Sequence, residues 1–196
     1  MIKQFGDFAT TQAVSEGAAL PKDGYVCKIL NAQVKDGTKG QYLQIAYDIA
    51  EGQYKDYFKG LYDAKKDENK KWSTYFFVNL PKDDGSEKDG WTKRLFKTFT
   101  NALEDSNEGY HWGWDESTLK DKLVGVKFYI EQSEYNGKIY DHTKAKWFIA
   151  AQKIRDGKIG QMPTDKLLTT GTTATKTGSN DFVSIPDNVT AEEIPF

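Results

Sequence analysis

Aromatic side chains alternate with lysines along extended stretches of this sequence. In "YKDYFK" (54–59), Lys55, Tyr57 and Lys59 share one face if the segment is a strand, because alternate residues of a strand point to the same side. "VKFY" (126–129) places Lys127 and Tyr129 together in the same way. A ring can stack on an unpaired base for ~1–3 kcal/mol, and a neighbouring lysine can neutralise a phosphate. These stretches therefore have the chemistry to hold single-stranded nucleic acid without reading its sequence.

Two further stretches, "KWSTYFFV" (71–78) and "KAKWFI" (144–149), extend this candidate surface. The full set of residues predicted to bind DNA is Lys55, Tyr57, Lys59, Lys71, Trp72, Tyr75, Lys127, Tyr129, Lys144, Lys146 and Trp147. A small polar domain also needs aromatic rings for its core. We assign Phe58, Phe76 and Phe128 to that core, whereas Trp72 and Trp147 suit either role.

Markers of enzymatic sites are scarce in the sequence. It has no GxxxxGK[ST] phosphate loop, no HExxH, no GxSxG and no GxGxxG after a strand. A magnesium-dependent nuclease would have to use Asp83 and Asp84, or Asp141 beside His142, but carboxylates in loops are mostly solvated. With Cys27 as the single cysteine and two distant histidines, no zinc cluster of ordinary spacing can form. We expect no catalytic residue, no metal and no cofactor.

Strand patterns dominate the body of the chain. Segments 24–35 and 41–49 flank the Gly-rich turn "DGTKG", and apolar and polar residues alternate within 41–49. Segment 54–58 is predicted to be a third, short strand and segment 71–78 a further extended piece. After residue 122 strands return, with Asn136 and Gly137 predicting a hairpin turn and Trp147 and Ile149 marking the final strand.

Segment 88–107 has a different pattern. Trp91, Leu95, Phe99 and Leu103 recur every four residues, which predicts an amphipathic helix, and 115–122 adds a short helical turn. Three strands, an intervening helix and two more strands are the order of an OB-fold. The predicted fold class is therefore mainly β, a five-stranded Greek-key barrel.

The composition changes abruptly near residue 163. Residues 1–163 suit one domain with a single core, whereas 164–196 are rich in Thr, Gly and Ser and are expected to form a disordered tail. The tail is acidic, with four carboxylate residues and one lysine from residue 167 onward, in a chain of net charge -2. No apolar run approaches the ~20 residues that cross a bilayer and no secretion signal is visible, so we expect a soluble, cytoplasmic protein.

The last five residues are Glu192, Glu193, Ile194, Pro195 and Phe196. This ending resembles the C-terminal tip of bacterial single-stranded DNA-binding proteins, in which acidic residues precede Ile-Pro-Phe. The resemblance implies a docking motif for replication and repair proteins. The carboxylates would meet a basic rim and Phe196 would enter an apolar pocket. The acidic run is thinner here, with Val189, Thr190 and Ala191 where an unbroken acidic stretch is expected.

The body of the chain resembles a different group of proteins. "PKDGYVCKILNAQVKDGTKGQYLQIAYDIAEGQYKDYF", "LEDSNEGYHW" and "LKDKLVGVKFYIEQSEYNGKI" are similar to proteins encoded in replication modules of phages and prophages of Gram-positive bacteria. The likeness covers roughly residues 20–163. It implies an OB-fold protein that binds single-stranded DNA, with partners among host or phage replication and recombination proteins.

Together these observations predict a non-enzymatic protein that coats unpaired DNA without sequence specificity and recruits partners through its tail. Three alternatives remain open: a carbohydrate-binding module on the same barrel, a magnesium-dependent nuclease, and an inhibitor that mimics DNA. The first predicts binding that is insensitive to salt and the second predicts cleavage that depends on divalent cations. The sequence is silent on oligomeric state, for which a homodimer is one option.

Overall fold

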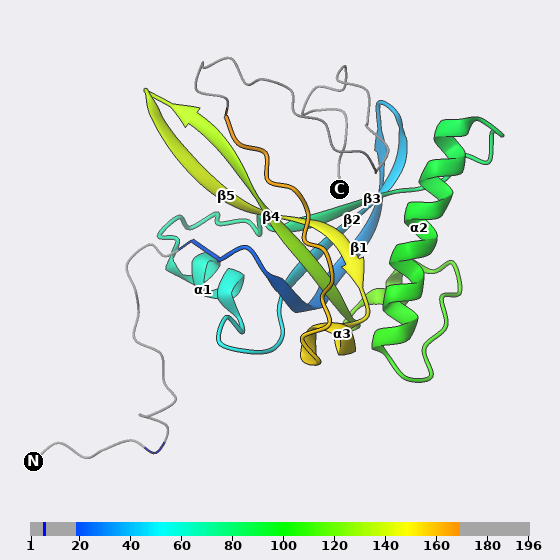
Figure 1. The fold of residues 1–196 in the computed structure, drawn as a ribbon, viewed down its shortest axis with the longest axis horizontal. Coiled ribbons are helices and arrows are strands. Elements are labelled where there is room, and N and C mark those ends of the chain that lie inside the picture. Colours follow the sequence, from blue (N-terminus) through cyan, green and yellow to red (C-terminus); the bar gives the residue numbers. More distant parts are fainter. Residues whose placement is uncertain (1–5, 7–18, 169–196) are drawn as a thin grey trace, which may run out of the picture.

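The protein folds around one antiparallel sheet whose strands follow the order β3-β2-β1-β4-β5 (Figure 1). The computed structural model describes residue 6 and residues 19–168. The strands are β1 (Gly24–Gly37), β2 (Gly40–Ile49), β3 (Tyr75–Asn79), β4 (Leu123–Tyr135) and β5 (Lys138–Ile149). The helical elements are α1 (Tyr57–Ala64), α2 (Glu87–Ser106), the 3-10 turn η1 (Glu116–Leu119) and α3 (Ala151–Arg155). The mainly β class and the long helix between β3 and β4 are as predicted.

The core lies between one face of the sheet and α2. Alternation along β2 buries Leu43, Ile45, Tyr47 and Ile49, as the sequence pattern indicated. On α2 the buried rings are Phe96 and Phe99, whereas Trp91 is 45% exposed. The spacing of four therefore located the helix but not its buried stripe: Leu95 is only half-buried, since a helix turns once in 3.6 residues and Phe96 takes that place.

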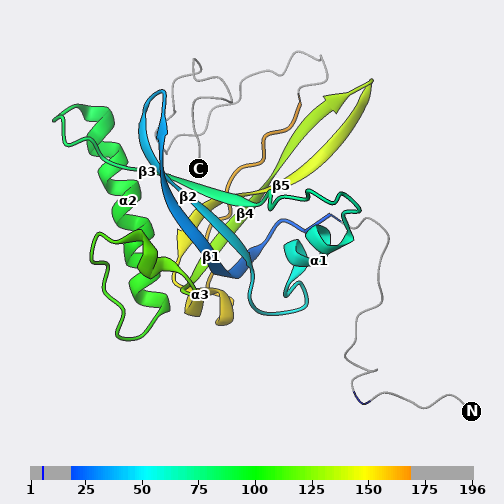
Figure 2. The same ribbon diagram turned by 180° about the vertical axis from the view of Figure 1, so that it is seen from behind.

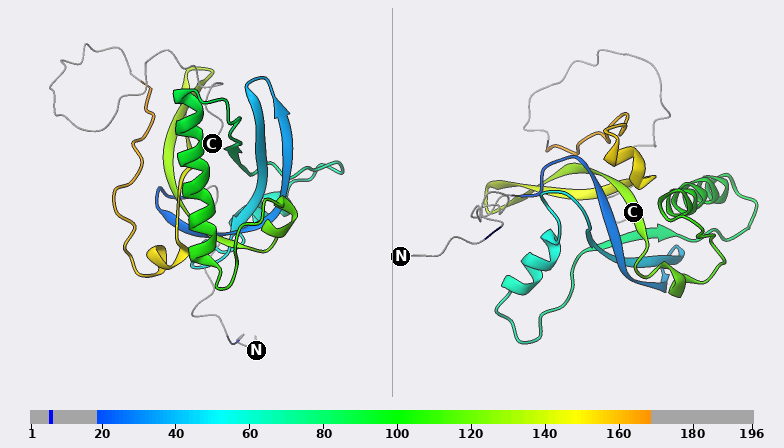
Figure 3. Two further views of the ribbon diagram at one scale, coloured as in Figure 1. Left: turned by 90° about the vertical axis from the view of Figure 1, so that its right-hand side faces the viewer. Right: turned by 90° about the horizontal axis from the view of Figure 1, so that it is seen from below.

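The sheet bends around this core. β3 and β5 are the two ends of the hydrogen-bonded order, yet Phe76 of β3 and Phe148 of β5 meet edge to face with ring centroids 5.4 Å apart. Phe99 of α2 lies 4.9 Å from the same Phe148 ring. Because α2 contacts β3, β4 and β5, it packs along the side of the molecule where the two ends of the sheet approach each other (Figure 3).

The predicted third strand at 54–58 is wrong. Asp48, at the end of β2, accepts hydrogen bonds from the backbone N–H groups of Phe58 (3.0 Å) and Lys59 (2.9 Å). These are donors in the first turn of α1, which begins at Tyr57 and has no cap from its own flanking side chain. Since an acceptor at this position replaces the capping residue, the chain turns into a helix here. The third strand is instead β3, within the segment expected to be a further extended piece.

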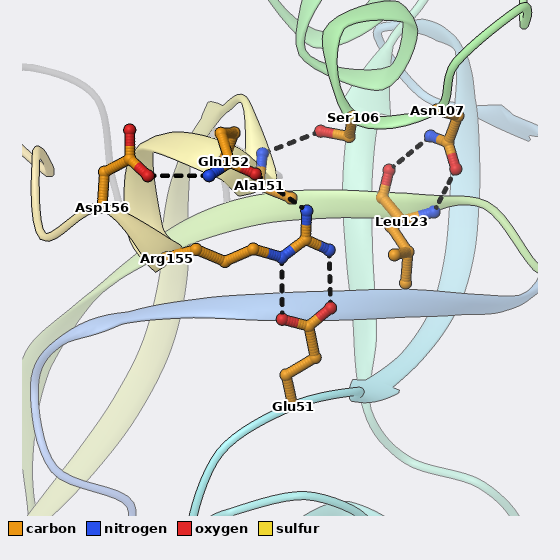
Figure 4. Close-up of polar contacts among 8 residues, drawn as sticks. All are labelled: Glu51, Ser106, Asn107, Leu123, Ala151, Gln152, Arg155 and Asp156. Atoms are coloured by element: carbon orange, nitrogen blue, oxygen red, sulfur yellow. Dashed lines mark hydrogen bonds and ion pairs between the residues drawn. The ribbon is translucent and has the colours of Figure 1, made fainter.

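Polar contacts join α3 to the end of α2 and to the turn after β2 (Figure 4). The Ala151 N–H donates to Ser106 Oγ (2.9 Å), and the Arg155 guanidinium binds both oxygens of Glu51 (2.9 and 2.6 Å). Asn107 fixes the start of β4, because its amide donates to the Leu123 carbonyl and accepts from the Leu123 N–H. The contacts of Ala151 and Arg155 fix α3 to α2 and to the turn after β2.

The β4–β5 hairpin projects from the body as a long arm (Figure 1), and Figure 2 shows the same projection from behind. Its turn is Asn136–Gly137, both with positive φ (52° and 72°), as the sequence predicted. Asp165 and Lys166 run beside β4: the Lys166 N–H donates to the Ile130 carbonyl (2.9 Å) and its carbonyl accepts from Gln132 (2.9 Å). The predicted tail begins at residue 164, but most of it, 169–196, lies outside the described residues.

Candidate functional site

Nine side chains on the solvent-facing side of β1, β2 and β3 form three rows. Strand register aligns Asn31 with Ala46 and Tyr75, Gln33 with Gln44 and Phe77, and Lys35 with Tyr42 and Asn79. We call these nine residues the outer grid. It contains three rings, four amides and one lysine, and it contains no carboxylate. Such a surface offers stacking faces and hydrogen bonds without repelling an anion.

The rings of the outer grid are half-buried and support one another. Phe77 contacts Tyr42 with centroids 5.8 Å apart and Tyr75 at 6.3 Å. Trp72 is held beside them, because the Tyr75 hydroxyl donates to the Trp72 carbonyl (2.9 Å) and Trp72 Nε1 donates to the Thr74 carbonyl (2.8 Å). A shallow hollow opens on the grid and is lined by Leu30, Asn31, Gln33, Gln44, Ala46, Trp72 and Tyr75.

Trp72 also packs against α1. The Tyr62 ring lies 5.6 Å from the Trp72 ring, and the Lys70 ammonium lies 4.9 Å from the Tyr62 centroid. Because α1 starts at the Asp48 cap, that buried carboxylate positions the indole indirectly. Burial raises the pKa of the Asp48 carboxyl, against the opposing effect of the backbone N–H groups of Phe58, Ile49 and Lys59.

A second group of predicted residues meets on the solvent side of β4 and β5. Register places Lys127 opposite Trp147 and Tyr129 opposite Lys144, and the irregularity between Lys127 and Phe128 leaves Lys146 as an extra residue. Lys146 Nζ lies 5.2 Å from the Tyr129 centroid and 6.0 Å from that of Trp147. With Lys166, whose Nζ is 5.7 Å from Tyr129, we call these residues the hairpin cluster.

The hairpin cluster has four lysines around the carboxylate of Glu131, and one of them, Lys127, donates to the Gln161 carbonyl (2.9 Å). Glu131 pairs with Lys144 and with Lys166, the latter at 3.3 Å. Burial alone would raise the pKa of the Glu131 carboxyl, but hydrogen bonds and charge from the two lysines together lower it. Burial, then the charge of Lys166, lowers the pKa of Lys146. An anion placed here would relieve the crowding of cations.

Tyr129 differs from the expectation that it projects freely away from the core. It lies on the same side as Lys127 but is only 6% exposed, and the ammonium groups of Lys146 and Lys166 cover its ring. Burial and the charge of Glu131 raise the pKa of Tyr129 to about 12. Stacking of a base on this ring would require the lysine side chains to move.

The structure does not bring Lys55, Tyr57 and Lys59 onto one strand face. Lys55 lies in the turn before α1, and Tyr57 is half-buried with its ring 5.1 Å from that of Phe58. Lys59 pairs with Asp63 one turn along the helix. The prediction that these three residues share one face was wrong, because it assumed that the segment is a strand. Lys71 is exposed next to Trp72 and remains beside the outer grid.

The outer grid and the hairpin cluster are separated by α3. Gly24 and Gly125 lie on the same side of the sheet as both groups, and a Cβ added to either would meet Ile154 within 3.4 Å. Val26 beside them is buried, at 3% exposure. The surface between the two groups is therefore covered by apolar side chains of α3 and the residues after it.

Sequence reasoning missed Tyr42, Gln33, Gln44, Phe77 and Lys166. The alternation in 41–49 did place Tyr42 and Gln44 opposite the core, so their side of the sheet was readable. Phe77 was hidden in the run "YFFV", where Phe76 is 1% exposed and Phe77 is half-buried. Phe76 and Phe128 are buried as assigned, and Phe58 packs against the core while partly exposed. The predicted docking residues 192–196 lie outside the described part of the chain.

The carboxylates considered for a nuclease lie on different elements. Asp83 pairs with Lys93, Asp84 accepts from the Ser86 N–H (2.9 Å), and Asp141 accepts from Gln132 on the arm (2.9 Å). Within residues 19–168 no group of three or more potential metal ligands occurs. None of the described helices is both long and apolar enough to span a membrane. Comparison of the chain with protein-family models and with curated proteins finds no match.

Proposed function

We propose that the protein binds single-stranded DNA without sequence specificity, as a non-enzymatic coat for unpaired strands during phage DNA replication or recombination in the cytoplasm of a bacterial host. The outer grid carries this proposal. It combines Tyr75, Phe77 and the adjacent Trp72 with four amides, and its nine positions include no carboxylate. Each base that stacks on such a ring contributes ~1–3 kcal/mol, and stacking accepts any base.

Polar groups of the site complement the rings. Lys35 in the grid and Lys71 beside Trp72 are exposed and can neutralise phosphates, which makes binding weaken as salt rises. Asn31, Gln33 and Gln44 can donate to or accept from base edges and sugars. The hairpin cluster supplies further lysines beyond α3. Its net positive charge supports a second contact with the same backbone.

We further propose that the sheet belongs to an OB-type barrel. The order β3-β2-β1-β4-β5 has the connectivity of that fold cut open between β3 and β5. The contact between Phe76 and Phe148 supports an approach of those two strands. In OB-folds the face of the second and third strands binds oligonucleotides, which is where the outer grid lies.

The terminal residues complete the proposal. Glu192, Glu193 and Phe196 offer two charges and a ring to a basic, apolar pocket on a replication or recombination protein. Pro195 limits the conformations lost on docking. A chain lacking residues 187–196 is expected to keep its affinity for DNA and to lose binding to such a partner.

Fluorescence anisotropy with labelled oligo-dT and with a duplex of equal length tests the DNA-binding proposal. We expect preference for the single strand, and a loss of about 5- to 150-fold for Phe77→Ala, the equivalent of ~1–3 kcal/mol. Gln33→Glu, at an exposed position, should weaken binding through charge without affecting folding. Trp114→Ala, at an exposed ring in the loop after α2, is the control. Equal affinity for duplex, or binding unchanged by salt, would contradict the proposal, and the latter would favour a carbohydrate ligand.

A further inference from the structure

A groove adjoins the outer grid at the turn between β1 and β2. Three grid residues, Tyr42, Phe77 and Asn79, also line this groove. Its other walls are the β1–β2 turn with Gly40, the loop that leaves β3 with Leu80, Lys82 and Asp84, and the first turns of α2 with Lys88 and Asp89. The groove therefore shares part of its wall with the outer grid.

The walls of the groove are fixed by hydrogen bonds. The Leu80 N–H donates to the Gln41 carbonyl (2.9 Å), and the Lys82 N–H donates to Asp89 Oδ1 (2.7 Å). Gly40 allows Lys82 to lie across the turn: its φ is 134°, and an added Cβ would stand 2.7 Å from Lys82 Cε. The lysine stem is thus packed against backbone, which orients its ammonium group at little further cost in entropy.

The groove has an excess of positive charge. Three lysines line it, and within residues 19–168 neither Lys82 nor Lys88 forms an ion pair. Of the two lining carboxylates, Asp89 is 4% exposed and lies 3.2 Å from Lys93, which it shares with Asp83. Asp84 is exposed and is occupied by the hydroxyl and N–H of Ser86, which lower the pKa of its carboxyl. The charges of Lys82 and Lys93 lower that pKa further, so within the described residues Lys88 is the groove lysine that faces neither an ion pair nor Asp84.

Beyond Lys88 the helix surface repeats the pairing of ring and cation. Trp91 follows Lys88 by three residues, so the two lie on neighbouring positions of the helix surface. The Trp91 ring is 45% exposed, and the Arg94 guanidinium lies 5.0 Å from its centroid. A strand that leaves the groove along α2 would meet a stacking surface with a cation already beside it.

We propose that a single strand bound on the outer grid continues through this groove, where Lys82 and Lys88 hold its phosphates, and ends against Trp91 on α2. This inference rests on the proposed function and extends its binding surface. It assigns α2, which otherwise supports the core, a direct contact with the ligand. It also predicts that longer strands bind more tightly than short ones because of residues outside the grid.

The test compares oligo-dT of about 4 and about 12 nucleotides, lengths within the range that one such barrel occupies. Each phosphate contact on a single strand contributes about 0.7 to the slope of log affinity against log salt. The double variant Lys82→Ala/Lys88→Ala should lower that slope by about 1.4 for the longer oligonucleotide. If the two proteins bind equally at about 1 M salt, the affinity of the variant at about 0.1 M salt should be about 25-fold lower. The shorter oligonucleotide should bind as before.

Lys158→Ala is the control, because Lys158 follows α3 at the opposite end of the domain from the β1–β2 turn (Figure 1). An unchanged advantage of the longer strand in the double variant would overturn the inference and leave the proposed function standing. Stronger binding in that variant would mean that the groove holds the acidic tail in competition with DNA, which also overturns it. Failure of the unsubstituted protein to bind either oligonucleotide would overturn both.

Discussion

Asp48 joins β2 to α1, and replacing it measures how much this junction contributes to stability. The carboxylate is 4% exposed and accepts three backbone hydrogen bonds, from Ile49 (2.8 Å), Phe58 (3.0 Å) and Lys59 (2.9 Å). Asp48→Ala removes all three hydrogen bonds at once. Loss of a helix cap costs about 1 kcal/mol, and one buried N–H left without a partner costs about 1–3 kcal/mol. We expect the free energy of unfolding to fall by about 2–4 kcal/mol.

Asp48→Asn separates the hydrogen bonds from the charge. Asparagine keeps one acceptor oxygen but no negative charge, and burial already disfavours that charge, as the raised pKa of Asp48 shows. We therefore expect Asp48→Asn to cost clearly less than Asp48→Ala at neutral pH. Because the folded pKa lies above the unfolded value of about 3.9, the natural protein should gain stability relative to Asp48→Asn as pH falls through the folded pKa.

Urea unfolding followed by circular dichroism, at several pH values, gives these differences directly. The reasoning is refuted if Asp48→Ala unfolds within about 0.5 kcal/mol of the natural protein, since the three hydrogen bonds would then add nothing net. It is also refuted if Asp48→Asn is the more damaging of the two variants. In that case the charge, rather than the acceptor geometry, would be what α1 requires.

Three further substitutions probe the contacts around α3 and β4. The Arg155 guanidinium lowers the pKa of the Glu51 carboxyl. The ion pair therefore stabilises the fold above the ordinary glutamate pKa, and this stabilisation is lost as pH falls through the pKa of the folded state. In urea unfolding, Glu51→Gln should lower the free energy of unfolding by about 0.5–1 kcal/mol at pH 7 and leave it unchanged at low pH. Asn107→Ala removes three hydrogen bonds of 2.8–2.9 Å and should lower stability by about 2–4 kcal/mol in the same assay. Gly125→Ala would place a Cβ 2.7 Å from the Ile149 carbonyl oxygen and should lower the melting temperature by several degrees, equivalent to about 1–3 kcal/mol. An unchanged melting temperature would show that β5 can retreat.

The strands were readable from the sequence where one face is buried and the other is solvated. Alternation located β2, and Asn136–Gly137 located the arm, because both signals are local. α1 could not be found this way, since the group that starts it, Asp48, lies ten residues upstream of Phe58 and on another element. A segment rich in tyrosine and phenylalanine then reads as a strand, because only tertiary structure supplies the cap.

The candidate site was predictable in part for the same reason. Trp72 and Tyr75 were chosen as aromatic residues next to lysines, and they lie beside or within the outer grid. Which ring of Phe76 and Phe77 faces solvent depends on the register with β2, and a shift of one residue would exchange them. The role of Lys166 was unreadable, since it reaches Tyr129 only because the chain returns beside β4.

The apolar side chains of α3 that cover Gly24 and Gly125 divide the solvent side of the sheet into two separate surfaces, the outer grid and the hairpin cluster. A polymer long enough to touch both must arch over Ile154, so each area would engage its own stretch of chain. Once one stretch is seated, the other is presented at the millimolar local concentration typical of short flexible tethers. Two individually weak contacts would then give a high overall affinity for the polymer. Either stretch could dissociate and rebind while the other keeps the polymer bound.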